Sequence, residues 1–272
     1  CYEENLAGLI QDGSLSMDEI DALVRPILAL KVRMGLFERP YVDETLLAEV
    51  VARPEHRQAA RRAAQRSMVL LRNEDGLLPL AKDLRNVAVI GPLADSMEAT
   101  EGSWMVIGHK PDAVTVLQGI RNKLPEAKVA FAPGPEIRRD FPHPFGEFDA
   151  TEKKPIQTPE AAEAAFRTAM ETARAADLVI MVLGENPDMA GEFASRASLD
   201  LPGRQEELLK AISALGRPVV LVLLNGRPLS INWAAEHVPA ILEAWEPGSE
   251  GGNAVADILF GDANPGGKLP VT

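Results

Sequence analysis

The sequence predicts an α/β fold in which helices cover both faces of a mostly parallel β-sheet. Five short runs rich in branched apolar residues follow one another from residue 87 onward, without alternation between apolar and polar positions. They are Val87–Ile90, Lys128–Ala132, Asp177–Leu183, Pro218–Leu224 and Ala240–Trp245. Strands of this kind are typical of sheets that are covered on both faces. Helical segments separate the runs, and this alternation predicts a three-layer α/β/α sandwich.

Four segments between and after these runs are expected to be helices: Val114–Lys123, Pro159–Ala176, Gly203–Leu215 and Glu250–Phe260. Two more helices are expected before the sheet. In residues 16–35, Ser16 and Glu19 have capping-box spacing and apolar residues follow with helical period, although Pro26 should bend or weaken the helix. A second helix is expected from about Pro54 to about Arg72.

The composition is that of an ordinary globular protein and argues against several classes of partner. Of the 272 residues, 46% are hydrophobic, and the net charge is −12, whereas nucleic-acid binding needs clustered Lys and Arg. The single cysteine, Cys1, allows no disulfide framework, and no apolar run is long enough to span a membrane. No metal-ligand spacing is found among the four histidines, which are His56, His109, His143 and His237. We therefore expect no cofactor or metal, no nucleic acid and no membrane partner.

The loops that follow the predicted strands are the expected place of function, because ligands of open α/β sheets bind outside the carboxyl ends of the strands. These loops comprise residues 91–113, 133–158, 184–202, 225–233 and 246–251. The loop of residues 133–158 is long and rich in Pro and Phe, and loops of that length are often functional. Residues 246–252 lack the Lys-Ser/Thr ending of a P-loop and are expected to form a tight turn before a helix.

Five segments, in the same order along the chain, resemble those of glycoside hydrolase family 3. Asp21–Tyr41 resembles the last helix of that family's barrel domain and its exit, and Ser67–Leu80 resembles the linker that follows. Val87–Ala94 is similar to the first strand of the family's second domain. Asn225–Leu229 and Gly261–Pro270 are similar to two further signatures. The resemblance covers essentially the whole chain.

This resemblance implies a division into the end of a truncated (β/α) barrel domain (residues 1–50), a linker helix and loop (51–85) and an α/β sandwich domain (86–272). The sequence has neither an initiator Met nor a signal-peptide pattern at its start, which also favours a truncation. The resemblance further implies a retaining β-glucosidase-like hydrolase of terminal β-linked sugars. The partners of the protein would be a β-glucoside or oligosaccharide substrate and the barrel domain of the same protein. The resemblance also favours a periplasmic or secreted location over a cytoplasmic one.

In this family the nucleophile is an Asp of the barrel domain, and none of the aspartates here matches its motif, so the chain alone is predicted to be inactive. Retaining hydrolysis needs two carboxyl groups, of which this chain can offer one. Glu192, between Gly191 and Phe193, has apolar neighbours and matches the acid/base Glu of the family's glucosidase branch. A solvent-facing loop acid is the alternative. Two other acids of the same loop are expected to be structural: Glu185 as a capping or pairing residue, and Asp188 as a turn residue.

Ser103 and Trp104 resemble the family's Gly-Ser-Trp segment, which lines the leaving-group side of the cleft. Trp104 is therefore predicted to stack against a sugar ring, and packing between domains is the alternative. Arg196 could pair with a neighbouring carboxylate and hold the loop, or be a plain surface residue. We take Ser103, Trp104 and Arg196 as candidates for substrate binding. The other two tryptophans, Trp233 and Trp245, are expected to pack in the core.

Two other functions stay open at the level of sequence. A β-xylosidase or an N-acetylglucosaminidase of the same family would differ only in substrate, although many of the latter are expected to take their acid/base from a barrel His. A flavodoxin-like binding domain without chemistry is the second alternative, since fold alone would permit it. The family signatures argue against this second alternative.

Overall fold

The computed structural model describes residues 2–51, 53–105, 113–139, 156–192 and 194–271. The chain divides into two compact units, residues 1–53 and residues 54–272. Several residues that figured in the sequence predictions lie outside the described residues: Cys1, His109, His143, Phe193 and most of the loop of residues 133–158. Within the part of the chain that is described, no helix is long and apolar enough to cross a membrane.

The described part of the first unit consists of helices whose apolar side chains are exposed. The helices are α1 (Tyr2–Gln11), α2 (Met17–Arg33) and α3 (Leu46–Val50). The predicted capping box is present, since the Glu19 N–H donates to Ser16 Oγ and the Ser16 N–H donates to the Glu19 carboxylate. α2 continues through Pro26, and it buries none of its residues. Leu23 is 70% exposed and Ile27 58%, so the apolar stripe of α2 is not covered by the described residues of its own unit.

The second unit is built on a six-stranded sheet in the order β1-β6-β5-β4-β2-β3. The strands are β1 (Val69–Asn73), β2 (Asn86–Ile90), β3 (Lys128–Ala132), β4 (Leu178–Gly184), β5 (Val219–Leu224) and β6 (Ala240–Glu243). β1 runs antiparallel to β6, and the other four pairs are parallel. The carboxyl ends of the five parallel strands therefore lie along the same edge of the sheet.

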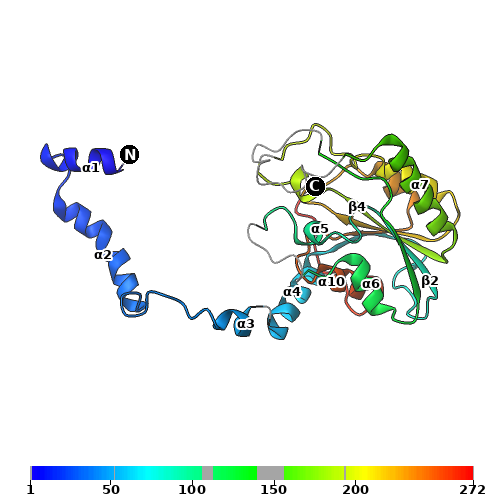
Figure 1. Ribbon diagram of the computed structural model, residues 1–272, viewed down its shortest axis with the longest axis horizontal. Coiled ribbons are helices and arrows are strands. Elements are labelled where there is room, and N and C mark those ends of the chain that lie inside the picture. Colours follow the sequence, from blue (N-terminus) through cyan, green and yellow to red (C-terminus); the bar gives the residue numbers. More distant parts are fainter. Residues whose placement is uncertain (1, 52, 106–112, 140–155, 193, 272) are drawn as a thin grey trace. The chain divides into compact units, whose positions relative to one another are not determined.

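Helices cover both faces of this sheet, with α7 on one side and α6 and α10 on the other (Figure 1). The helices of this unit are α4 (Pro54–Ser67), α5 (Met97–Glu101), α6 (Val116–Lys123), α7 (Pro159–Arg174), α8 (Gln205–Ser213), α9 (Asn232–His237) and α10 (Gly251–Leu259). β4 is buried along its whole length, and its side chains alternate between two apolar clusters. Ile180 and Val182 pack in the cluster of α4, α6 and α10, whereas Val179 and Met181 pack in the cluster of α7, α8 and α9.

These layers confirm the predicted α/β/α sandwich with a mostly parallel sheet. Each of the five predicted strands is present, and the four helices predicted between and after them are α6, α7, α8 and α10. The prediction of a single helix from Pro54 to Arg72 is wrong, because α4 ends at Ser67 and Val69 begins β1. Pairing of Leu70 with Leu242 of β6 stabilises the extended conformation there, and it outweighs the local helical pattern.

Candidate functional site

The candidate site lies in the loops that leave the carboxyl ends of β2, β4, β5 and β6. A tightly packed glycine follows β2 directly, and another is the last residue of β4. A β-carbon at Gly91 would lie 2.0 Å from the Val182 carbonyl oxygen, and one at Gly184 would lie 1.8 Å from the Leu224 carbonyl oxygen. Because neither position has room for a side chain, the loops begin at closely fixed points on the sheet.

Glu185 directly follows β4 and is the buried centre of an ion-pair cluster. Its side chain is 0% exposed, Oε1 lies 2.6 Å from Arg196 Nη1, and Oε2 lies 3.2 Å from Arg227 Nε. Such pairing offsets the cost of removing a charged carboxylate from water. The pairing predicted for Glu185 is present, and of the two alternatives left open for Arg196 the structure shows the pairing with a carboxylate.

Arg227 and Arg196 also fasten the two sides of the loop that carries Glu192. Arg227 Nη2 donates to the carbonyl oxygens of Met189 and Ala194, the latter at 2.6 Å. Arg196 Nη2 donates to the Asp200 carbonyl oxygen at 2.9 Å. The backbone on each side of Glu192 is thus held by guanidinium groups that are themselves anchored on Glu185, while the Glu192 residue is exposed. Asp188 lies in a short 3-10 helix, Pro187–Met189, as expected for a turn residue.

Ser103 and Trp104 lie against the same loop, although they come from the segment after β2. A β-carbon at Gly191, which has φ +94°, would lie 3.4 Å from Ser103 Oγ and 3.7 Å from Trp104 Cε2. Trp104 is 69% exposed, so most of its indole surface is accessible. The structure thus brings the predicted residues Ser103 and Trp104 next to the neighbour of Glu192.

Glu246, predicted from the sequence only to be part of a turn, lies among these loops. Its Oε1 accepts a hydrogen bond from the Ser103 N–H at 2.9 Å and another from Ser103 Oγ at 2.7 Å. Its position three residues after the end of β6, at the carboxyl edge of the sheet, is the signal that could have identified it. The role of Arg227 was also not predicted, because contacts with backbone carbonyl oxygens cannot be inferred from residue types.

A buried acid lies beneath these loops. Glu243, the last residue of β6, is 3% exposed and its Oε1 accepts the Trp245 N–H at 2.9 Å. Asn225 Nδ2 lies 3.3 Å and 3.2 Å from its two carboxyl oxygens and also donates to the Arg227 carbonyl oxygen. Burial raises the pKa of Glu243 to about 7, against the lowering effect of the Trp245 and Asn225 donors.

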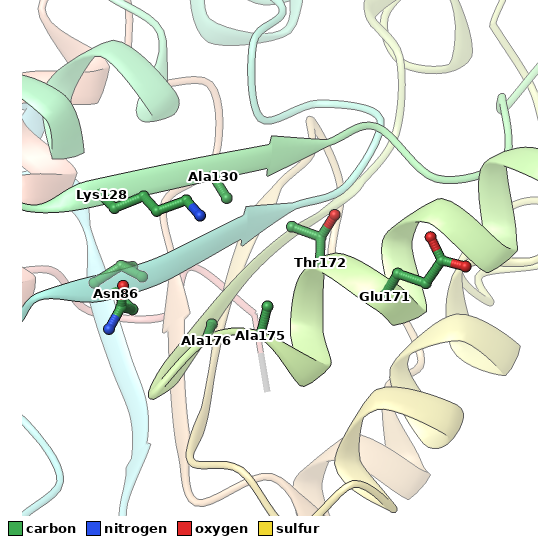
Figure 2. Close-up of a pocket in the computed structure, with 8 residues that line it drawn as sticks. Asn86, Lys128, Ala130, Glu171, Thr172, Ala175 and Ala176 are labelled. Carbon is green, nitrogen blue, oxygen red and sulfur yellow. The ribbon is translucent and has the colours of Figure 1, made fainter.

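A cavity of about 270 Å³ lies elsewhere in the second unit and contains none of the predicted site residues. Asn86 and Lys128, the first residues of β2 and β3, line it together with Glu171 and Thr172 of α7 (Figure 2). It is therefore at the amino ends of the strands, at the opposite edge of the sheet from the loops described above.

These loops offer an exposed carboxyl group, that of Glu192, next to Gly191, which lies against the aromatic side chain of Trp104. Glu185 is engaged with two arginines, Glu246 with Ser103, and Glu243 with the Trp245 backbone, whereas Glu192 is exposed. Within the described residues, no group of three or more His, Cys, Asp or Glu side chains could hold a metal ion. The arrangement suits proton transfer to a group bound against Trp104.

Comparison with known proteins points to one family. The sequence model of the Glycosyl hydrolase family 3 C-terminal domain matches residues 68–272. The periplasmic beta-glucosidase of Salmonella typhimurium is 41% identical over 283 residues, which cover 100% of this chain and 36% of that protein. A beta-xylosidase of Formosa agariphila is 38% identical over 94% of this chain and 33% of its own length. The chain therefore spans about a third of the length of the curated relatives it matches.

Solved structures give the same result. The beta-glucosidase from Listeria innocua in complex with isofagomine has a TM-score of 0.79 and 35% identity, over 97% of this chain and 34% of that one. A beta-glucosidase involved in saponin metabolism from intestinal bacteria has a TM-score of 0.80 and 33% identity, over 100% of this chain and 40% of that one.

Proposed function

Because this chain belongs to glycoside hydrolase family 3, we propose that it forms part of a retaining β-glucosidase and supplies the acid/base loop and the leaving-group side of the active site. The observation that carries this proposal is the loop of residues 184–202. It is fastened through Arg196 and Arg227 to the buried Glu185, and it presents an exposed Glu192 directly after Gly191, the residue that lies against the exposed indole of Trp104.

In the proposed reaction Glu192 acts twice. It first protonates the glycosidic oxygen as the bond to the leaving group breaks, while a carboxylate nucleophile attacks the anomeric carbon and forms a covalent bond to it. It then removes a proton from the water that releases the sugar from the covalent intermediate. The nucleophile would be an Asp of a barrel domain that precedes residue 1. In this proposal residues 1–50 complete the barrel domain, residues 51–85 form the linker and residues 86–272 form the sandwich domain.

Ser103 and Trp104 would bind the leaving group. An exposed aromatic face suits stacking against the apolar C–H side of a sugar ring, and Trp104 offers such a face within van der Waals reach of Gly191. Arg196 would serve substrate binding by holding the loop in place, because its guanidinium is engaged with Glu185 and the Asp200 carbonyl oxygen.

A β-xylosidase is the second candidate, and the identity of 38% to the Formosa agariphila beta-xylosidase favours it. The two functions can be separated by comparing kcat/KM for aryl β-glucosides and aryl β-xylosides. For the compartment, we propose a periplasmic or secreted location, which agrees with the description of the Salmonella typhimurium relative.

The test of the proposed function is the substitution Glu192→Gln in a full-length enzyme that contains this chain. Substrates with poor leaving groups need a proton and should slow by about 10²–10⁴-fold in glycosylation, the usual contribution of general acid catalysis. Dinitrophenyl glycosides need little protonation, so their first step should be nearly unchanged and the glycosyl-enzyme should accumulate. Azide needs no general base, so it should restore turnover by attacking the sugar carbon and yield a β-glycosyl azide.

Asp188→Asn and Glu185→Gln are the matched controls on the same loop. Neither should show azide rescue, and Glu185→Gln should slow good and poor substrates together by loosening the loop. If Glu192→Gln slows both classes of substrate alike and azide has no effect, Glu192 is not the acid/base. If Glu185→Gln shows the azide rescue instead, the acid/base is a different carboxylate of this loop.

A further inference from the structure

The chain turns sharply just before Glu246, at a residue with an uncommon backbone conformation. Trp245 has φ +57°, which bulky side chains rarely adopt and which the surrounding structure must stabilise. Its N–H donates to Glu243 Oε1 at 2.9 Å, and its carbonyl oxygen accepts the Asn225 N–H at 3.2 Å. Buried partners on β6 and after β5 therefore fix the direction in which the next residue, Glu246, leaves the sheet.

The Glu246 side chain occupies a slot between two glycines. A β-carbon at Gly102 would lie 2.6 Å from both Cβ and Cδ of Glu246, and one at Gly226 would lie 2.8 Å from Oε1. Such distances are too short for real contacts, so a side chain at either position would displace the carboxylate. The loops after β2 and after β5 thus leave room for this one side chain.

Within the slot the carboxylate accepts two hydrogen bonds from the same residue, Ser103. Oε1 accepts both the N–H and the hydroxyl of Ser103, at 2.9 Å and 2.7 Å. Hydrogen bonds to an ionised acceptor are about twice as strong as neutral ones, and two bonds to one residue fix both its backbone and its side chain. The residue so fixed is the immediate neighbour of Trp104.

We propose that Glu246 is a positioning residue that sets the specificity for the leaving group, by holding the Ser103–Trp104 corner against Gly191. This inference rests on the proposed function, in which Trp104 contacts the leaving group. Trp104 is 69% exposed, so among the described residues its own packing holds the indole only weakly, and the two hydrogen bonds of Ser103 fix the backbone next to it. The loop of Glu192 is held separately by Arg227 and Glu185, so loss of Glu246 should move the indole and leave the proton donor in place.

The test compares two substrates in the full-length enzyme: laminaribiose, whose leaving group is a sugar, and methyl β-glucoside, whose leaving group is too small to cover an indole. For Glu246→Ala, kcat/KM for laminaribiose should fall about tenfold, mainly through KM, the loss expected for a hydrogen bond to a charged group. The value for methyl β-glucoside should stay within about twofold. Trp104→Ala should show the same selectivity, and the double variant should be no worse than Trp104→Ala alone.

Two milder variants keep the test informative if Glu246→Ala fails to fold. Glu246→Gln retains an oxygen that can accept from Ser103 and should recover most of the lost kcat/KM. Ser103→Ala retains the N–H bond and should show a smaller loss with the same selectivity. Glu236→Ala, which removes an exposed acid of α9, is the matched control and should leave kcat/KM unchanged for both substrates.

The inference is overturned if Trp104→Ala is selective for the leaving group while Glu246→Ala and Glu246→Gln either have no effect or slow both substrates equally. It is also overturned if the effects of Glu246→Ala and Trp104→Ala simply add. A wild-type enzyme that hydrolyses neither substrate would instead refute the proposed function, and with it the premise of the inference.

Discussion

Glu243 is expected to make the stability of the sandwich domain depend on pH between about 4.5 and 7. Its carboxyl is 3% exposed, and burial raises its pKa from 4.5 to about 7. Between these values the folded state binds more protons than the unfolded state, so the free energy of unfolding falls as pH rises through this window. The difference corresponds to about 3 kcal/mol, at about 1.4 kcal/mol for each pKa unit.

The perturbation is Glu243→Gln, which keeps an oxygen to accept the Trp245 N–H but cannot ionise. Any cost of the amide itself is the same at every pH, so the informative quantity is how the difference between variant and wild type changes with pH. Relative to wild type, the variant should gain about 3 kcal/mol in free energy of unfolding between pH 4.5 and pH 8. Other ionisable groups cancel in this difference.

The assay is equilibrium unfolding of the chain in urea, followed by circular dichroism at several pH values from 4.5 to 8. The free energy of unfolding of the variant minus that of wild type should rise by about 3 kcal/mol from the acidic to the alkaline end of this range. Parallel curves, with a constant difference at every pH, would show that Glu243 does not carry a raised pKa in the folded state and would refute the reasoning.

Three further predictions concern the chain as a whole. Residues 1–272 alone should not hydrolyse an aryl β-glucoside, and steady turnover would place a nucleophile within them. The amides of α2 should exchange hydrogen much faster than those of β4, because α2 buries no residue; equal protection in a proven monomer would contradict this. Asp257→Ala should lower the free energy of unfolding by about 3 kcal/mol, because Asp257 is buried between Arg61 and Lys123. In the same urea titration, Asp262→Ala, which removes a more exposed partner of Lys123, should cost less than about 1 kcal/mol.

The sheet could be predicted because its strands are apolar on both sides. In β4, Val179 and Ile180 face different layers and are both fully buried. A strand-length run of apolar residues on both faces fits the centre of a sheet that helices cover on both sides. β1 could not be predicted in the same way. Its extended conformation depends on pairing with β6, which lies about 170 residues later in the chain. The local sequence does not reveal this pairing partner. The helical pattern of α4 continues past Ser67, so the sequence alone predicted a helix where β1 forms.

The candidate site was predictable to the extent that its residues carry chemistry. The acids of the loop after β4 are visible in the sequence, and Glu185 and Arg196 lie where their pairing could be foreseen. Arg227 acts through the carbonyl oxygens of Met189 and Ala194, which every residue possesses, so its role appears only in three dimensions. Glu246 depends on the space left by Gly102 and Gly226, which come from two separate loops.

The antiparallel pairing of β1 with β6 has a practical consequence for expressing this domain by itself. β6 is a short, wholly buried strand, and β1 satisfies the hydrogen-bonding groups along its outer side. A fragment that begins at residue 86 would expose that side as an unprotected edge, a template on which strands from other molecules can add. Fragments that begin before Val69 should therefore remain monomeric at concentrations at which fragments that begin at residue 86 aggregate.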